Sequence, residues 1–171
     1  MSNTNPAAAK AFTVVFRTAV PEIITDVGVV PPFLPNQPSP EVLAMKALWD
    51  TGATHCCITK TAAERAKLPA IGRAIVTGVH GSQERDEYYV NLMLPNQVMV
   101  SRVRATECDE VEGTFDVIIG MSVITLGDFA ISQPENETIF TFRIPSIEKL
   151  DFVEQAEIYS IQALKKASQS Q

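Results

Sequence analysis

The chain has 171 residues, of which 46% are apolar and 20% charged, and its formal net charge is −6 at pH 7. This composition is typical of a soluble protein with one core, and the acidic excess argues against a nucleic-acid-binding surface, which needs clustered lysine and arginine. The chain has no apolar run of the roughly 18 to 20 residues that a bilayer span needs, and residues 1–10 lack a signal-peptide core. We therefore expect a cytoplasmic protein without nucleic-acid or membrane partners.

The first part of the chain predicts strands that lead to an aspartate. We expect a flexible N-terminus over residues 1–10, then strands over 12–17 and 23–30. Five prolines between residues 31 and 40 predict an irregular surface loop. The apolar run 43–49 follows and predicts the strand that ends at Asp50.

Asp50 begins the tetrapeptide Asp-Thr-Gly-Ala. A carboxylate at the end of an apolar run, followed by Thr-Gly, lies on a tight turn whose backbone N–H groups can face it. That arrangement displays a reactive aspartate. Asp and Gly are also ordinary turn residues, so the tripeptide alone is weak evidence and the rest of the chain must support it.

The middle of the chain predicts a short helix, a hairpin and further strands. Either Thr59 or Thr61 opens the helix, with a capping box over 61–64, and Pro69 ends it. Residues 74–83 and 88–94 predict a hairpin with a glycine on each side of its tip. Strands over 98–106, 114–119, 129–132 and 138–144, with a short helix at 121–125, complete a pattern typical of a closed all-β barrel.

The C-terminal segment differs in kind from the rest. Apolar residues recur every three or four positions from Ile147 to Leu164, which predicts an amphipathic helix capped by Ser146 and followed by a polar tail. A helix with one apolar stripe must bury it. We expect the stripe to pack on the protein's own strands, with docking on a partner subunit as the alternative.

Three of these segments occur in an order that resembles the retropepsin-like aspartic proteases. They are the Asp50 turn, the glycine-flanked hairpin, and the segment Phe115-Asp116-Val117-Ile118-Ile119-Gly120-Met121 ahead of a short helix. The last segment looks closer to retrotransposon and cellular relatives than to retroviral enzymes. The resemblance covers residues 11–146 as one protease domain, and residues 147–171 form the added C-terminal helix and tail. It implies an all-β, closed antiparallel β-barrel with a flap hairpin and one or two short helices.

The resemblance also assigns roles to individual residues. Asp50 would be catalytic, Gly52 would bring its N–H to the carboxylate, and the flap would close over an extended peptide. The support positions would be Thr51, Gly52, Ala53, Ile119 and Gly120, and the flap positions Gly78, Val79, His80 and Gly81.

The number of catalytic aspartates predicts the oligomeric state. Peptide hydrolysis by this chemistry needs two carboxylates that share one proton. The sequence contains only one Asp-Thr-Gly, because none of the other aspartates is followed by Thr/Ser-Gly. We therefore expect a two-fold homodimer in which Asp50 meets its mate, acting on a peptide or protein substrate.

Two positions depart from the retroviral pattern. Retroviral enzymes usually carry an acidic residue after the tetrapeptide and an arginine after the later glycine, and the two side chains pair. This chain has Thr54 and Met121 there. Losing both charges is tolerable, whereas losing one would leave a partly buried charge unpaired. We expect the dimer interface and the substrate subsites to differ accordingly.

The histidines and cysteines raise the question of other chemistry. His55, Cys56, Cys57, His80 and Cys108 are of the types that bind zinc, but their spacing fits no closed motif and strand neighbours point to opposite faces. No third orienting group supports a cysteine nucleophile. We expect no metal, no cofactor, and free cysteines as small buried side chains in a reducing environment, with reversible oxidation possible for an exposed one.

Two functions are therefore compatible with the sequence. The first is a homodimeric aspartic endopeptidase whose Asp50 faces its mate. The alternative is a non-proteolytic retropepsin-like module for dimerisation or peptide binding, which is favoured if subunits associate through the C-terminal helix and keep the two aspartates apart.

Overall fold

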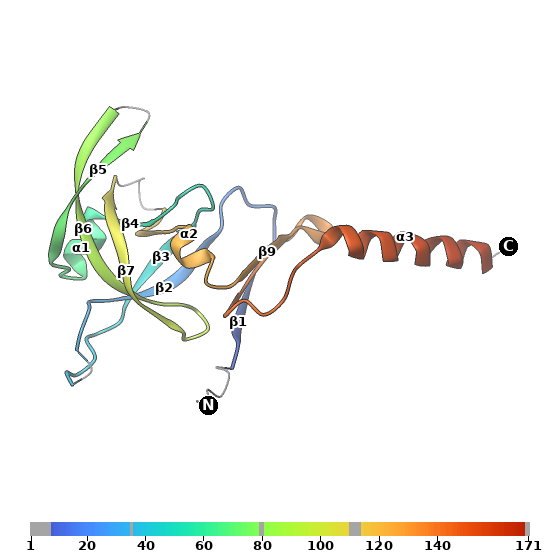
Figure 1. The fold of residues 1–171 in the computed structure, drawn as a ribbon, viewed down its shortest axis with the longest axis horizontal. Helices are drawn as coiled ribbons and strands as arrows, with labels where there is room; N and C mark the ends of the chain where they lie inside the picture. Colours follow the sequence, from blue (N-terminus) through green and yellow to red (C-terminus); the bar gives the residue numbers. More distant parts are fainter. Residues whose placement is uncertain (1–7, 35, 79–80, 110–113, 170–171) are drawn as a thin grey trace, which may run out of the picture.

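The computed structural model describes residues 8–34, 36–78, 81–109 and 114–169, and most of these residues lie in strands (Figure 1). The strands are β1 Lys10–Phe16, β2 Ile24–Val30, β3 Leu43–Trp49, β4 Cys56–Thr59, β5 Ala70–Gly78, β6 Gly81–Met93, β7 Met99–Cys108, β8 Val117–Ile119, β9 Asp128–Ser132 and β10 Thr138–Ile144. The helices are α1 Lys60–Arg65, α2 Met121–Ile124, the 3-10 helix η1 Pro134–Asn136 and α3 Phe152–Gln169. The expected all-β class with a hairpin, short helices and a C-terminal helix is confirmed.

The strands form two sheets. The larger has the order β2-β3-β8-β4-β7-β6-β5, and the smaller has the order β1-β10-β9. Strand β6 also pairs with β2, with Val29 opposite Leu92. The pairings therefore run in a circuit from β2 through β3, β8, β4, β7 and β6 back to β2, while β5 extends outward as the hairpin partner of β6.

Two pairs in the larger sheet differ from the antiparallel pairing that we expected. Strand β3 pairs with β8 in parallel, and β4 pairs with β7 in parallel. Parallel neighbours need a long connection between them, and the chain supplies one because each pair is separated by other strands. The parallel pair β3–β8 places the ends of both strands, and hence Asp50 and Gly120, at the same edge of the sheet.

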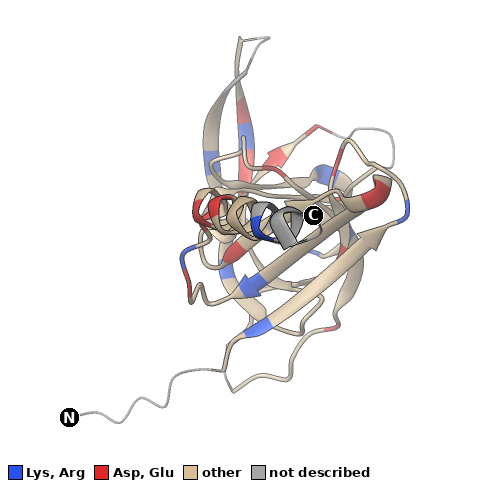
Figure 2. Ribbon diagram, turned by 90° about the vertical axis from the view of Figure 1, so that its right-hand side faces the viewer, with Lys and Arg blue, Asp and Glu red and all other residues tan. Residues whose placement is uncertain are grey.

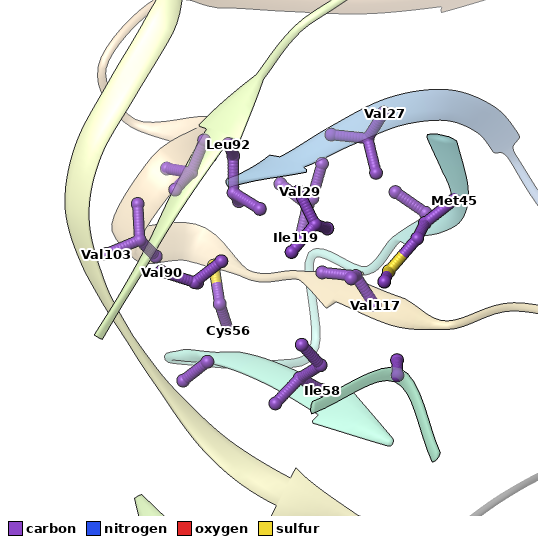
Figure 3. Packing of buried hydrophobic residues seen from close by; sticks show 14 of the residues in the cluster. Val27, Val29, Met45, Cys56, Ile58, Val90, Leu92, Val103, Val117 and Ile119 are labelled. Carbon is purple, nitrogen blue, oxygen red and sulfur yellow. The ribbon is translucent and has the colours of Figure 1, made fainter. Parts of the chain in front are cut away.

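Alternating side chains place the core inside this circuit. On β3, Met45, Ala47 and Trp49 are buried, while the residues between them are more exposed. Figure 3 shows how the buried residues of the larger sheet converge. Those labelled there are Val27, Val29, Met45, Cys56, Ile58, Val90, Leu92, Val103, Val117 and Ile119.

An aromatic cluster joins the small sheet to the core. The ring centroid of Trp49 lies 5.0 Å from those of Phe140 and Phe142, and Phe12 and Phe129 pack around the same indole. The indole N–H donates to the Thr25 hydroxyl at 2.9 Å, so its polar atom is paired although the ring is buried. This cluster fixes the residue that immediately precedes Asp50.

The structure decides between the two expected caps of α1. The Thr59 hydroxyl accepts a hydrogen bond from the Ala62 N–H at 3.2 Å, so Thr59 is the N-cap. Thr61 lies inside the helix, and its capping-box role is wrong. The short helix expected at 121–125 corresponds to α2.

The C-terminal helix differs from the prediction in its start and in its packing. It begins at Phe152, and Asp151 rather than Ser146 caps it by accepting from the Val153 N–H at 3.2 Å. Figure 1 shows α3 projecting away from both sheets. Phe152 and Tyr159 are 66% and 76% exposed, so the expected burial against the protein's own strands does not occur.

Asp128 holds the segment that leads to α3. Its carboxylate accepts hydrogen bonds from the Ser146 hydroxyl at 2.5 Å and from the Ile147 N–H at 3.2 Å, and it pairs with Arg143. Ser146 is thereby used to hold the chain against β9 and is not free to cap a helix.

Among the described residues, no helix is both long and apolar enough to cross a bilayer.

Candidate active site

The Asp50 turn is built around the aspartate itself. The Gly52 N–H donates to Asp50 Oδ1 at 2.8 Å, and the Ala53 N–H donates to the Asp50 carbonyl at 3.3 Å. Asp50 is half-buried, and Thr51 is exposed. A Cβ on Gly52 would lie 3.1 Å from Oδ1, so glycine is the residue that leaves room for this contact. The turn holds the carboxylate in place with a backbone donor.

A backbone hydrogen bond joins the turn to the end of β8. The Asp50 N–H donates to the Ile119 carbonyl at 3.0 Å. The first N–H groups of α2 then reach the residues after the turn, because Met121 donates to the Ala53 carbonyl at 2.8 Å and Ser122 to the Thr54 carbonyl at 3.0 Å. These N–H groups have no partner within their own helix. The helix start and the turn therefore satisfy each other's backbone groups.

Asp116 is structural rather than reactive. Its N–H donates to the Lys46 carbonyl, its carbonyl accepts from the Thr59 N–H, and its carboxylate accepts from the Lys46 N–H, each at 2.9 Å. Arg65 of α1 completes the set with an ion pair of 3.0 Å. One side chain thus joins β3, α1 and the start of β8, as expected for a strand-end aspartate.

The hairpin β5–β6 rises beside the turn. Gly78 pairs with Gly81 at its outer end, while Val79 and His80 lie outside the described residues. Ile75 on the hairpin is 75% exposed. The hairpin therefore presents apolar side chains at an edge where they are not packed into the core.

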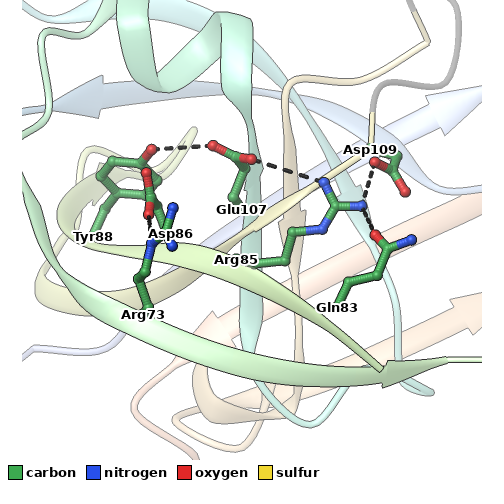
Figure 4. Close-up of polar contacts among 7 residues, drawn as sticks. All are labelled: Arg73, Gln83, Arg85, Asp86, Tyr88, Glu107 and Asp109. Atoms are coloured by element: carbon green, nitrogen blue, oxygen red, sulfur yellow. Dashed lines mark hydrogen bonds and ion pairs between the residues drawn. The ribbon is translucent and has the colours of Figure 1, made fainter. Parts of the chain in front are cut away.

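Polar contacts connect the strands of the hairpin away from its Gly78–Gly81 end. Acidic and basic residues lie next to each other along it (Figure 2), and Arg73 on β5 bonds Asp86 on β6 at 3.0 Å. In Figure 4, Arg85 points between the carboxylates of Glu107 and Asp109, at 3.8 and 2.6 Å. These pairs link β5, β6 and β7 below the tip.

Tyr88 completes the same network. Its hydroxyl donates to Glu107 at 3.2 Å, as Figure 4 shows. Burial, together with the nearby Glu107 charge, raises the pKa of Tyr88 to about 12. The phenol therefore stays a hydrogen-bond donor through neutral pH.

A cleft of about 670 Å³ lies between the turn and the hairpin. Its lining combines residues after the Asp50 turn, residues of the hairpin and residues of β7. They are Ala53, Thr54, His55, Cys57, Ala74, Ile75, Val76, Glu87, Arg104 and Thr106. The cleft thus brings together segments that are far apart in the sequence, and Ala53 of the Asp50 turn is part of its lining.

Several lining residues escaped the sequence analysis. Glu87 is buried and forms an ion pair with Arg104, whose side chain is exposed. The hydrogen bond and the charge of Glu87 raise the pKa of the Arg104 guanidinium. Only the pairing of β6 with β7 brings these two residues together, so no local motif could have revealed them.

The cysteines are free and differ in environment. Cys56 is buried, whereas Cys57 and Cys108 are partly exposed. The described residues contain no cluster of three or more His, Cys, Asp or Glu side chains that could hold a metal ion. The expectation of small buried thiols is therefore met by Cys56 alone.

Comparison with known proteins gives one family match and one similar fold. Residues 41–123 match the family model described as aspartyl protease. The fold is similar to that of a retropepsin-like aspartic protease from Rickettsia conorii, with a TM-score of 0.51 and 11% identity over 80% of this chain and 96% of that one. No curated protein matches the chain.

Two viral structures show weaker likeness. The EIAV protease complexed with the inhibitor HBY-793 gives a TM-score of 0.44 at 18% identity, over 60% of this chain and 85% of that one. The simian foamy virus protease gives 0.37 at 18% identity, over 58% and 91%. The family match across the Asp50 turn and β8 agrees with the fold of the Rickettsia protein: residues 41–123 match the aspartyl protease family, and the chain has a retropepsin-like fold.

Proposed function

We propose that the protein is an aspartic endopeptidase that works as a homodimer. The observation that carries this proposal is the position of Asp50, whose carboxylate is held by the Gly52 N–H at 2.8 Å in the turn that contributes Ala53 to the lining of the cleft. The match of residues 41–123 to the aspartyl protease family supports it. An extended peptide in this cleft would meet the carboxylate of Asp50.

The chemistry requires a second carboxylate. In an aspartyl dyad one carboxylate deprotonates the attacking water, and the other, protonated, polarises the scissile carbonyl. The sequence has one Asp-Thr-Gly, so the second aspartate comes from a second copy of the chain. A two-fold axis beside Asp50 makes the two turns equivalent. The two protons then belong to the pair, not to either residue.

The residues around Asp50 take supporting roles. Thr51 reaches across the axis to brace the facing turn, Gly52 orients the carboxylate, and Ala53 keeps the wall of the cleft small. Ile119 accepts a hydrogen bond from the Asp50 N–H, and Gly120 packs against the backbone of the segment that follows the turn. None of these five changes its bonding during the reaction.

The hairpin acts as the flap. Gly78, Val79, His80 and Gly81 form its tip, which closes over the bound peptide and excludes water. The exposed apolar residues Ile75 and Val76 then contact substrate side chains. A peptide substrate binds in an extended conformation because its backbone can pair with the edges of the cleft.

Cleavage of a broad peptide library tests this function. Wild type, Asp50→Asn and Asp26→Asn are compared from mildly acid to neutral pH, with the dimer followed by sedimentation. Asp26 is a matched control because its carboxylate is exposed and pairs with exposed Lys46. We expect Asp50→Asn alone to lose cleavage by at least about three orders of magnitude. Residual cleavage in a folded, dimeric Asp50→Asn would refute the proposal.

A non-proteolytic module for dimerisation or peptide binding is the second candidate. The exposed apolar residues of α3, among them Phe152 and Tyr159, favour it, since association through this helix could keep the two Asp50 turns apart. A wild-type protein that is dimeric but cleaves no peptide in the library, and whose dimer is lost on removal of residues 152–171, would support this candidate instead.

A further inference from the structure

Two further hollows continue the cleft along β7. A recess of about 250 Å³ shares His55 and Arg104 with the cleft and reaches Ser122 in α2. A groove of about 610 Å³ shares Ser101 and Arg102 with the recess and is lined on its other side by the proline-rich loop between β2 and β3. Because each hollow shares two lining residues with the next, the three form one continuous path along the strand.

This path has the length of several residues of an extended peptide. Arg102 and Arg104 are exposed, whereas Val103 between them is buried, so both arginines lie on the face of β7 that points away from the core. Strand residues are about 3.3 Å apart, so the four steps from Thr106 in the cleft to Arg102 in the groove span about 13 Å. A peptide extended in the cleft therefore reaches Arg102 with a side chain about four residues away.

The path carries positive charge that its own lining does not neutralise. Glu87 pairs with Arg104 at the cleft end. Among the described residues, neither the recess nor the groove has an aspartate or glutamate in its lining. Every described arginine except Arg17 and Arg102 forms an ion pair with a carboxylate. An acidic group on a ligand would therefore find a cation ready to pair with it at Arg102, although the protein as a whole has a net charge of −6.

The backbone holds Arg102 in a conformation that such side chains rarely adopt. Its φ is 56°, in the left-handed region. The buried Asn91 side chain fixes this residue, because its Oδ1 accepts from the Arg102 N–H at 2.8 Å and its Nδ2 donates to the Pro31 carbonyl at 3.4 Å. The guanidinium lies over the Tyr89 ring, 5.2 Å from the ring centroid. Strained backbone held by its surroundings is typical of ligand-binding positions, and here it presents a cation to the groove.

Apolar side chains line the groove next to this cation. Leu34 is 63% exposed and Phe33 is partly exposed, and both line the groove together with Tyr89. Apolar walls with a few polar groups, in hollows of about 300 to 1,000 Å³, are typical of ligand sites. A ligand that uses both features carries an acidic group beside a large apolar one.

We propose that the recess and the groove extend the cleft and bind the flank of an extended peptide, with an acidic side chain at Arg102 and a large apolar side chain against Phe33 and Leu34. The shared lining argues that the same peptide also occupies the cleft. Selection of substrates by these residues rests on the proposed peptidase function, whereas binding of the flank does not. Each subunit of the proposed homodimer supplies one such path, so both flanks of the scissile bond are tested.

Binding is measured without turnover. A random peptide library is selected on the full-length Asp50→Asn protein, and the bound peptides are sequenced. We expect Glu or Asp beside a large apolar residue to be enriched at least about threefold over Gln or Asn in the same place, which is within the range of partly exposed ion pairs. High salt should reduce this enrichment because it screens exposed charges. A bound pool with no acidic preference would overturn the proposal.

Reversal of one charge separates a binding role from a structural one. In the Asp50→Asn background, Arg102→Glu should shift the enrichment from acidic to basic peptides, and the milder Arg102→Gln should abolish it. Arg17→Glu is the matched control, because Arg17 is also exposed and without a carboxylate partner among the described residues, but does not line the path. Peptides that bind elsewhere are enriched equally on all variants and cancel. An unchanged acidic preference in folded Arg102→Glu or Arg102→Gln would overturn the proposal.

The apolar half of the site has its own variant. Leu34→Ser should reduce the enrichment of large apolar residues beside the acid and leave the acidic preference in place. Ile131→Ser is the control, because Ile131 is 45% exposed on β9 of the smaller sheet and does not line the groove. Equal apolar enrichment on Leu34→Ser and Ile131→Ser would contradict the assignment of the apolar side chain to the groove.

Cleavage by the wild type distinguishes this inference from the peptidase function. Library peptides with Glu-Phe, Gln-Phe or Lys-Phe about four residues from the cleaved bond are compared by kcat/KM, with the pair on either side. We expect Glu-Phe to be preferred over Gln-Phe at least about threefold, and Arg102→Glu to prefer Lys-Phe. Cleavage that is independent of the flank would overturn the inference and leave the peptidase function intact. Acidic enrichment on Asp50→Asn without any cleavage by the wild type would instead count against the peptidase function and leave the binding site in place.

Discussion

Gly120 lies directly against the backbone of His55, and a Cβ on Gly120 would come within 2.4 Å of the His55 carbonyl oxygen. The carbonyl oxygen of Ala53 is nearly as close, at 2.7 Å from the same position. Both oxygens are backbone atoms that cannot move aside without moving the chain. The end of β8 and the segment after the Asp50 turn therefore pack at a distance that only glycine allows.

Gly120→Ala should consequently disturb the turn that holds Asp50. Contacts below 3 Å with two main-chain carbonyl groups force a backbone shift, and overpacking of this kind costs about 1 to 3 kcal/mol of the free energy of unfolding. We expect a lower Tm and a larger loss of cleavage than stability alone explains. Gly72→Ala is the matched control, because its Cβ would meet nothing closer than Glu87 at 3.9 Å. Similar losses in both variants would contradict this account.

A mixing experiment tests whether two chains share one site. If each active site needs an Asp50 from both subunits, an excess of Asp50→Asn captures wild-type chains in dimers with a single carboxylate. At a tenfold excess, mass action leaves about a tenth of the wild-type activity once subunits have exchanged. An equal excess of Asp26→Asn, whose exposed carboxylate lies in a surface ion pair, should cause no inhibition. Undiminished activity with Asp50→Asn would show that one chain suffices.

The Asp50 strand and turn could be predicted from local sequence, because their signals are local. The run Leu43–Trp49 is apolar, and β3 has those same bounds. The parallel pairing of β3 with β8 could not be predicted this way, since it depends on contacts between segments about 70 residues apart. The same holds for Glu87 and Arg104, which meet only through the pairing of β6 with β7.

The misplaced predictions share a physical cause. Cys56 and Cys57 have the same side chain. Side chains alternate between the two faces of β4, and the position of the strand in the sheet decides which of the two cysteines faces the core. Likewise, the spacing of apolar residues predicted a C-terminal helix but not its surroundings. Ser146 looked like a cap until the structure placed its hydroxyl on Asp128, a residue 18 positions earlier. Local patterns indicate what a segment can form, and distant partners decide what it contacts.

Tyr88 should make the protein sensitive to alkaline pH. The pKa of Tyr88 is raised to about 12 in the folded chain, from an ordinary value near 10, by burial and Glu107. The folded state therefore holds the proton more tightly, and the stability it contributes is present below pH 10 and lost as the pH rises through 12. Two pKa units correspond to at most about 2.7 kcal/mol, and solvent screening of the partly buried hydroxyl makes the expected loss smaller. Tyr88→Phe should flatten the fall in Tm over this range, and an unchanged fall would show that other groups cause it.

Asp128 should hold the segment that leads to α3 in a pH-dependent manner. Hydrogen bonds from Ser146, and then from Arg143, lower the pKa of the Asp128 carboxyl. A lowered folded pKa means that the stabilisation is complete above the ordinary carboxyl range and is lost as the pH falls through the lowered value. Because the Ile147 N–H donates to this carboxylate, its hydrogen exchange is a direct readout. We expect Asp128→Asn to reduce the protection of that amide at neutral pH, while Asp26→Asn leaves it unchanged. If protection survives in Asp128→Asn, the carboxylate does not hold the segment, and the direction of α3 has another origin.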